Sequence, residues 1–146
     1  MPDDVKISEE IRLKVEMFFA TRPSSLSDLL GVRYVELDKK RVVATMPVSA
    51  QNKQPFGILH GGASVALAET LASIGGWLNI DEQRFNAVGL EINANHLRPV
   101  IQGLVTGSAV PLHLGRTTQV WQIDIVNEAG KPVCISRCTL AIVPKG

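Results

Sequence analysis

The chain has 146 residues, of which 45% are hydrophobic and 20% are charged, and its formal net charge is +1 at pH 7. A chain of this length buries most of the surface that its unfolded form exposes, so we expect a single domain over residues 1–146. The balanced charge excludes a nucleic-acid platform, which needs a basic excess. The longest apolar run is interrupted by Glu69 and by glycines, so it makes a poor membrane span.

The start of the chain and its cysteines indicate the cellular compartment. Residues 1–6 are acidic and polar and lack an apolar segment, so we expect no secretory signal. Cys134 and Cys138 match no zinc-binding spacing, and the sequence holds no other cysteine to complete a zinc site. We expect both to be reduced residues of the core or of an interface, in a cytoplasmic protein without a metal.

Residues 1–30 or so are expected to form a helical extension. Ser8 is a suitable N-cap, and acidic residues follow it in the first turn of a helix predicted over residues 8–20. Residues 23–25 end this helix, and residues 26–30 are predicted to add one further turn. Three apolar residues share one side, which is typical of a surface helix: Leu13, Met17 and Ala20.

Six later segments have the composition of strands. Residues 32–37 and 41–46 flank a polar turn and predict a hairpin. The other four are joined by short loops and span residues 87–97, 100–112, 117–126 and 132–143. In the first of these four, alternation places Val88, Leu90, Ile92 and Ala94 on one face, and in the second Gly103 and Gly107 are candidate bulges.

The most apolar stretch lies between His60 and Ile80 and contains one charged residue, Glu69. Its Ala-rich composition predicts a helix buried on most sides, because a surface helix carries a stripe of charged residues. The helix is expected to begin at Gly61-Gly62 and to lose helical character at Gly75-Gly76, since glycine costs about 1 kcal/mol relative to alanine. Its core ridge is predicted to comprise Leu67, Leu71, Ile74 and Leu78.

Glu69 falls on the side of this helix opposite the core ridge. Its neighbours on that side are mostly small, so a backbone, a ligand or a second subunit can approach closely: Gly62, Val65, Ala66, Ala72, Ser73 and Gly76. Two interpretations of Glu69 remain open. Either it marks the solvent side of an amphipathic helix, or it is partly desolvated and acts as a base or nucleophile near neutral pH.

The strands are segregated from the long helix, which indicates an α+β fold and not a parallel βαβ sheet. A sheet of about six antiparallel strands covers one long central helix only if it curls around it. The small-residue side of the helix stays open in such a subunit, so a homodimer is the expected completion.

The motif His60-Gly61-Gly62, followed by Ala68-Glu69, resembles the hotdog-fold thioesterases of the 4-hydroxybenzoyl-CoA thioesterase branch, which carry a catalytic carboxylate on the central helix. Further segments are similar to the bacterial subgroup that acts on aromatic acyl-CoAs, namely residues 53–57, 89–96, 111–115 and 119–123. That subgroup includes the 1,4-dihydroxy-2-naphthoyl-CoA hydrolases of menaquinone synthesis and the enterobactin proofreading thioesterases. The resemblance covers about residues 30–143 and implies no cofactor, because CoA is part of the substrate.

The resemblance implies a role for each residue of the motif. Glu69 attacks the thioester carbonyl or activates a water, and the Gly61 N–H at the helix N-terminus holds the developing oxyanion. Gln54 orients the carbonyl or the water, His60 fixes the loop and assists near the leaving thiolate, and Ser73 binds a water or the carboxylate. Simpler roles remain open for His60, as a partner of loop backbone groups, and for Ser73, as a packing residue.

Family members place the carboxylate of one subunit against the Gln/His/Gly loop of the other. The resemblance therefore implies two shared sites per homodimer, and it favours a dimer of dimers. Five residues are assigned to the CoA or acyl group: Phe56, His96, Arg98, Gly115 and Arg116. For His96, Arg98 and Arg116 the alternative is a solvated surface position, since basic residues bind phosphates but are also common at strand ends.

The expected activity is hydrolysis of an aromatic acyl-CoA, with 1,4-dihydroxy-2-naphthoyl-CoA as one candidate substrate. The alternatives are a thioesterase that clears a misacylated aryl carrier protein, a broad-range acyl-CoA thioesterase, and a non-catalytic acyl-CoA-binding hotdog protein. The last has no need of Glu69. A hotdog dehydratase is disfavoured. Dehydratases resemble one another in a longer His-to-acid separation with prolines before the helix, and this sequence does not have that pattern.

Overall fold

The computed structural model describes residues 4–146, so the first three residues of the predicted extension and of the acidic start lie outside the described range. The N-terminal elements are β1 (Lys6–Ile7), the 3-10 turn η1 (Glu9–Ile11), α1 (Arg12–Thr21) and α2 (Leu26–Leu29). They are followed by β2 (Arg33–Asp38), β3 (Arg41–Pro47), α3 (Gly61–Leu78), β4 (Phe85–His96), β5 (Leu104–Leu114), β6 (Thr118–Asn127) and β7 (Pro132–Pro144).

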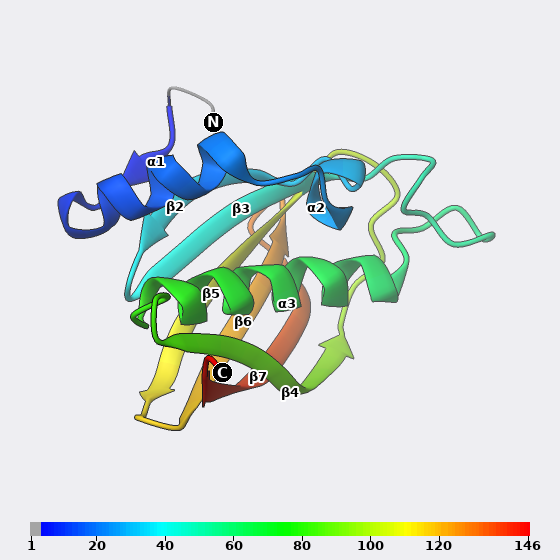
Figure 1. Ribbon diagram of the computed structural model, residues 1–146. Coiled ribbons are helices and arrows are strands. Elements are labelled where there is room, and N and C mark those ends of the chain that lie inside the picture. The colour runs from blue at the N-terminus through cyan, green and yellow to red at the C-terminus, as the bar shows by residue number, and fades with distance from the viewer. Residues whose placement is uncertain (1–3) are drawn as a thin grey trace.

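One sheet with the strand order β1-β2-β3-β5-β6-β7-β4 curls around α3 (Figure 1). Its neighbouring strands are antiparallel, except that β1 runs parallel to β2. This arrangement confirms the predicted α+β hotdog fold. The sheet has seven strands and not about six, because β1 has only two residues, too few for a strand pattern to appear in the sequence.

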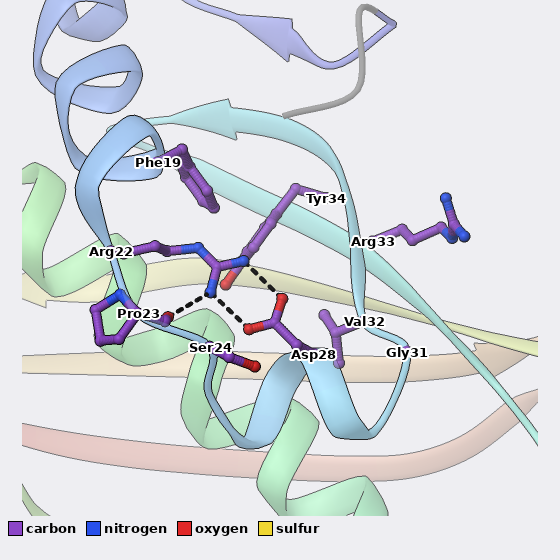
Figure 2. A pocket seen from close by; sticks show the side chains of 9 residues that line it. All are labelled: Phe19, Arg22, Pro23, Ser24, Asp28, Gly31, Val32, Arg33 and Tyr34. Atoms are coloured by element: carbon purple, nitrogen blue, oxygen red, sulfur yellow. Dashed lines mark hydrogen bonds and ion pairs between the residues drawn. The ribbon is translucent and has the colours of Figure 1, made fainter.

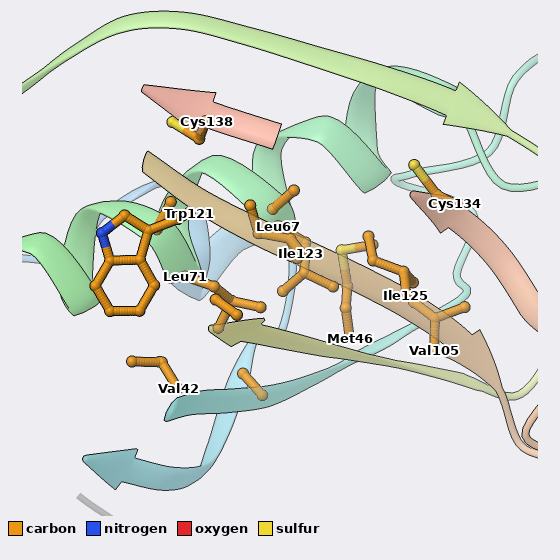
Figure 3. Packing of buried hydrophobic residues seen from close by; sticks show 14 of the residues in the cluster. Val42, Met46, Leu67, Leu71, Val105, Trp121, Ile123, Ile125, Cys134 and Cys138 are labelled. Atoms are coloured by element: carbon orange, nitrogen blue, oxygen red, sulfur yellow. The ribbon is translucent and has the colours of Figure 1, made fainter. Parts of the chain in front are cut away.

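The core fills the space between α3 and the sheet (Figure 3). Leu67 and Leu71 are fully buried, Leu78 is 1% exposed, and Ile74 packs at the edge of the core, so the predicted ridge is confirmed. The sheet contributes the facing residues Met46, Val105, Trp121, Ile123 and Ile125.

Helix α3 continues through Gly75-Gly76 to Leu78, so the predicted loss of helical character is wrong. A Cβ atom on Gly75 would lie 2.6 Å from the Trp121 ring, and one on Gly76 would overlap the Leu140 side chain. The two glycines therefore let β6 and β7 pack directly against the helix backbone. This contact offsets the low helix propensity of glycine, which was the basis of the prediction.

The predicted alternation in β4 is interrupted by a bulge between Gly89 and Glu91. Ile92 lies at the core, whereas Val88 and Leu90 are 47% and 62% exposed in the single chain. An extra residue in a strand reverses the facing of every residue beyond it, so the four apolar residues do not share one face.

The two candidate bulges in β5 are also wrong. Gly103 precedes the strand and has a φ of 85°, a turn conformation that favours glycine. Gly107 lies in regular pairing, where a Cβ atom would be 2.7 Å from Leu71 of α3. The irregularity in β5 falls instead between Pro111 and His113.

The N-terminal extension packs on the outside of β2 and α3. The α-helix begins at Arg12 after η1, and Ser8 makes no side-chain cap. The buried residue of α1 is Val15. Leu13 and Met17 are 71% and 62% exposed, so the side of α1 that was predicted to be apolar faces solvent. Lys14 Nζ donates hydrogen bonds of 2.8 Å to the carbonyls of Trp77 and Ile80, which ties α1 to the C-terminal end of α3.

Cys134 and Cys138 are both buried free thiols, as expected for reduced core residues. Burial, with the Glu69 and Glu91 carboxylates nearby, raises the pKa of Cys138 to about 11, and burial also raises the pKa of Cys134. We therefore expect neither thiol of the native protein to react with a chromogenic disulfide reagent at pH 8, because the thiolate is the nucleophile. Two thiols per chain should react after denaturation in guanidinium chloride, and a fast reaction before denaturation would contradict the burial.

Candidate active site

His60 lies at the junction between the long loop after β3 and the start of α3. It is the N-cap of α3, and its Nδ1 accepts a 2.8 Å hydrogen bond from the Gly62 N–H. The neutral ring therefore carries its proton on Nε2, on an exposed side chain. The His60 backbone N–H donates a hydrogen bond to the Asn52 carbonyl at 2.8 Å, so both the backbone and the side chain of His60 are held in place.

Asn52 is a structural residue of the site that the sequence pattern did not single out. It is 3% exposed, donates to the Pro47 carbonyl at 2.7 Å and accepts from the Ser49 N–H at 2.9 Å. Together with its bond to His60, these contacts hold the loop in one shape. A polar residue in a loop is usually expected to be exposed to solvent. The only signal in the sequence was the residue type, because asparagine is common in turns that are closed by a side-chain hydrogen bond.

Gly61 is the first residue of α3, and among residues 4–146 no hydrogen-bond acceptor is recorded for its N–H. The imidazole of His96 lies directly over it, 2.8 Å from the position of a Cβ atom. Gly61 lines a cavity of about 490 Å³ together with Gln54, His96 and Arg98. The structure thus brings four of the predicted site residues together at the positive end of a helix dipole, an arrangement suited to a developing oxyanion.

Glu69 and Ser73 line a different cavity, of about 390 Å³, on the outer side of α3. Glu69 is exposed, and its Oε1 lies 3.1 Å from the position that a Cβ atom on Gly89 of β4 would take. The expected desolvation of Glu69 is therefore absent within one chain. Two of the residues expected beside it, Ala72 and Gly76, turn instead to the sheet and are buried.

The two groups of residues are too far apart within one chain to act on the same atom. Gly61 and Glu69 are separated by eight positions of one continuous helix, which corresponds to a rise of about 12 Å along its axis. A single carbonyl group cannot contact the Gly61 N–H and the Glu69 carboxylate of the same subunit. We call these two groups the loop half-site (Gln54, His60, Gly61) and the helix half-site (Glu69, Ser73).

The remaining predicted contacts lie in three places. Arg98 donates a 3.0 Å hydrogen bond to the Pro132 carbonyl at the rim of the loop half-site cavity. Phe56 is 88% exposed and lies in the loop between β3 and α3, in which Gly57 has a φ of 84°; this loop projects from the sheet (Figure 1). Gly115 and Arg116 lie in the β5–β6 turn, where Gly115 N–H donates to the Thr118 carbonyl, and neither residue lines the cavities of the two half-sites.

No helix in the described range is long and apolar enough to cross a membrane. Among residues 4–146, no three His, Cys, Asp or Glu side chains form a group able to hold a metal ion.

Removal of the His60 side chain should lower the stability of the fold, because the Gly62 N–H loses its cap. We expect His60→Ala to lower the free energy of unfolding by about 1 kcal/mol, and His60→Asn, which retains a capping group, to restore most of the loss. Urea denaturation of the three proteins measures both changes. Equal stability of His60→Ala and the unchanged protein would show that the imidazole does not cap α3.

Comparison with known proteins agrees with the fold. Residues 56–134 match the family model described as Thioesterase superfamily. The 1,4-dihydroxy-2-naphthoyl-CoA hydrolase of Escherichia coli is 45% identical over 90% of this chain and 96% of its own length. The proofreading thioesterase EntH of Cronobacter turicensis is 46% identical over 90% of this chain and 95% of its own length.

The solved structures include a mutant form of a thioesterase from Pseudomonas aeruginosa. It is 48% identical to this chain, has a TM-score of 0.84, and the match covers 89% of this chain and 94% of that one. A thioesterase from Haemophilus influenzae is 50% identical, with a TM-score of 0.79 over 83% of this chain and 84% of that one. The chain belongs to the thioesterase superfamily and is a thioester hydrolase with the hotdog fold.

Proposed function

We propose that this enzyme hydrolyses aromatic acyl-CoA thioesters to the free acid and CoA, at two sites that a homodimer shares. In each site one subunit supplies Glu69 and Ser73, and the other supplies Gln54, His60 and Gly61. The observation that carries this proposal is the separation of the two half-sites by about 12 Å along α3, with Gln54 and Gly61 lining one open cavity and Glu69 and Ser73 lining another.

The edge of the sheet supports a dimer. β4 is the last strand of the sheet order, so one of its edges has no neighbour within residues 4–146. It has 12 residues and carries the exposed side chains of Val88 and Leu90. A long apolar edge strand is a template for pairing with another strand. Because Glu69 lies against Gly89 of this strand, pairing at β4 would bring a second subunit to the helix half-site.

The chemistry follows from the two half-sites. Glu69 removes a proton from water, whose oxygen attacks the thioester carbonyl, or attacks that carbonyl itself to form an anhydride that water then cleaves. The Gly61 N–H of the second subunit donates a hydrogen bond to the carbonyl oxygen and stabilises the negative charge that develops there. As the C–S bond breaks, the thiolate leaves beside His60, and His96 and Arg98 bind the CoA portion.

The name of one relative, 1,4-dihydroxy-2-naphthoyl-CoA hydrolase, supports an aromatic acyl group. The test is thiol release from benzoyl-CoA, 1,4-dihydroxy-2-naphthoyl-CoA, and short and long fatty acyl-CoAs. We expect kcat/KM to be highest for the aromatic thioesters, with little background from the buried cysteines.

Two other results would replace the proposal. Equal kcat/KM for all of the acyl-CoAs would indicate a broad-range thioesterase. Release from none of them, but from a benzoylated aryl carrier protein, would show that the substrate is carried by a protein and not by CoA.

A further inference from the structure

The cavity of the helix half-site is built from two parts of the chain that are distant in sequence. Its inner side is the outer surface of α3, which contributes Glu69 and Ser73. Its far side comes from the N-terminal extension and β2. This side combines the polar residues Arg22, Ser25 and Ser27 with four apolar or aromatic ones: Phe18, Phe19, Leu26 and Tyr34. The volume of about 390 Å³ lies within the usual range of roughly 300–1,000 Å³ for small-molecule pockets.

The aromatic side chains of this far side pack against one another. The ring centroids of Phe18 and Phe19 lie 5.2 Å apart in an edge-to-face arrangement, and the ring centroids of Phe19 and Tyr34 lie 5.3 Å apart. Phe18 also contacts the ring of Trp77 on α3 at 4.8 Å. The cluster connects the extension to β2 and to the central helix, so a shift of the extension would change the depth of the cavity.

A clasp of three polar residues, Arg22, Ser25 and Asp28, closes the turn between α1 and α2. Figure 2 shows its Arg22–Asp28 pair. The Arg22 guanidinium donates two hydrogen bonds of 2.7 Å to the Asp28 carboxylate. The Ser25 N–H and hydroxyl donate to the same carboxylate at 2.8 and 3.0 Å. These contacts, with that of Arg22 first, hold the pKa of Asp28 well below its usual range.

The clasp contributes little to the free energy of folding, because its ion pair lies at the surface. Its main effect is to fix the geometry of the turn. A bidentate pair fixes direction as well as distance. The Arg22 guanidinium lies 5.2 Å from the Phe19 ring, and Figure 2 shows both beside Tyr34. Phe19, Arg22 and Tyr34 also line a neighbouring cavity of about 570 Å³, so they separate the two spaces.

We propose that the far side of the helix half-site cavity is the end wall of the acyl pocket, with Phe19 as a specificity-determining residue and the Arg22–Asp28 pair as the device that positions it. This inference rests on the proposed function, because it places the acyl group beside Glu69. A fixed aromatic wall accepts a compact planar acyl group and excludes a long flexible chain, which must pass the wall to fit.

The test compares Phe19→Ala with the unchanged enzyme on benzoyl-CoA and dodecanoyl-CoA. We expect Phe19→Ala to raise the ratio of kcat/KM for dodecanoyl-CoA to that for benzoyl-CoA by about tenfold or more, the scale of hydrophobic pocket discrimination. Arg22→Gln should raise KM for benzoyl-CoA severalfold with little change in kcat, and Arg22→Lys should restore part of the loss. Arg12→Gln is the matched control, because Arg12 forms its ion pair with Glu9 on the same extension but does not line the cavity.

The experiment separates this inference from the proposed function through binding. S-benzyl-CoA and S-dodecyl-CoA are thioethers that no thioesterase hydrolyses, and calorimetry measures their Kd for each variant. A shift of the Kd ratio in Phe19→Ala supports the wall even if the enzyme releases thiol from no acyl-CoA. Unchanged kcat/KM and Kd ratios in a Phe19→Ala protein with an unaltered circular dichroism spectrum would overturn the inference.

Discussion

Replacement of Glu69 by Gln is expected to reduce thioester hydrolysis at least 100-fold while CoA-thioester binding is kept. The amide has nearly the shape of the carboxylate but neither accepts a proton from water nor attacks a carbonyl, so the loss falls on kcat. Glu69 is exposed in the single chain, with its Oε1 close to Gly89 of β4, so the fold has little need of its charge. Thiol release and calorimetry with S-benzyl-CoA measure the two effects.

Glu128→Gln is the matched control for this experiment. Glu128 is an exposed acid in the β6–β7 turn and lines neither half-site cavity. We expect its kcat to equal that of the unchanged enzyme. Retention of turnover in Glu69→Gln would remove the carboxylate from the mechanism and leave the non-catalytic role of a solvent-facing helix residue.

Trp121→Ala should produce the largest loss of stability among the single substitutions considered. Trp121 is fully buried, its ring lies against the backbone of Gly75, and its Nε1–H donates a 2.9 Å hydrogen bond to Gln119 Oε1. Truncation of a buried tryptophan leaves a large cavity and an unpaired acceptor, which together cost about 3–5 kcal/mol. Denaturant unfolding followed by circular dichroism measures the change in the free energy of unfolding.

Trp77→Ala makes the same chemical change at the surface of α3. Trp77 is only partly buried, beneath Phe18 and Lys14, so its truncation should cost clearly less. A smaller loss in Trp121→Ala than in Trp77→Ala would contradict the account of Gly75-Gly76, in which a close contact between β6 and α3 maintains the helix through two glycines.

The sequence predicted most of the fold because periodicity reports the face of an element that is buried. The ridge of α3, from Leu67 to Leu78, and the long strands followed from such patterns. The errors arose where tertiary packing decided the outcome. Gly75 and Gly76 look like helix breakers unless the neighbouring Trp121 and Leu140 are known, and the bulge in β4 leaves no local sign.

The sequence motif supplied the candidate residues, and the family resemblance implied that two subunits share them. The structure places Gln54, Gly61, His96 and Arg98 on one cavity. Sequence could not show that Phe19 lies beside the Glu69 cavity, because that contact joins segments about fifty residues apart. Glu69 is exposed in the single chain, so the expected burial is wrong for one chain; in the proposed homodimer the second subunit would cover it.

Subunit complementation tests the shared site most directly. Glu69→Gln and the double variant Gln54→Ala/His60→Ala are co-expressed with different affinity tags, and the heterodimers are purified through both. Each homodimer should have less than about a hundredth of the unchanged activity, whereas the heterodimer should recover about half, since two-fold symmetry leaves it one intact site of two. A heterodimer no more active than either homodimer would show that each site lies within a single chain.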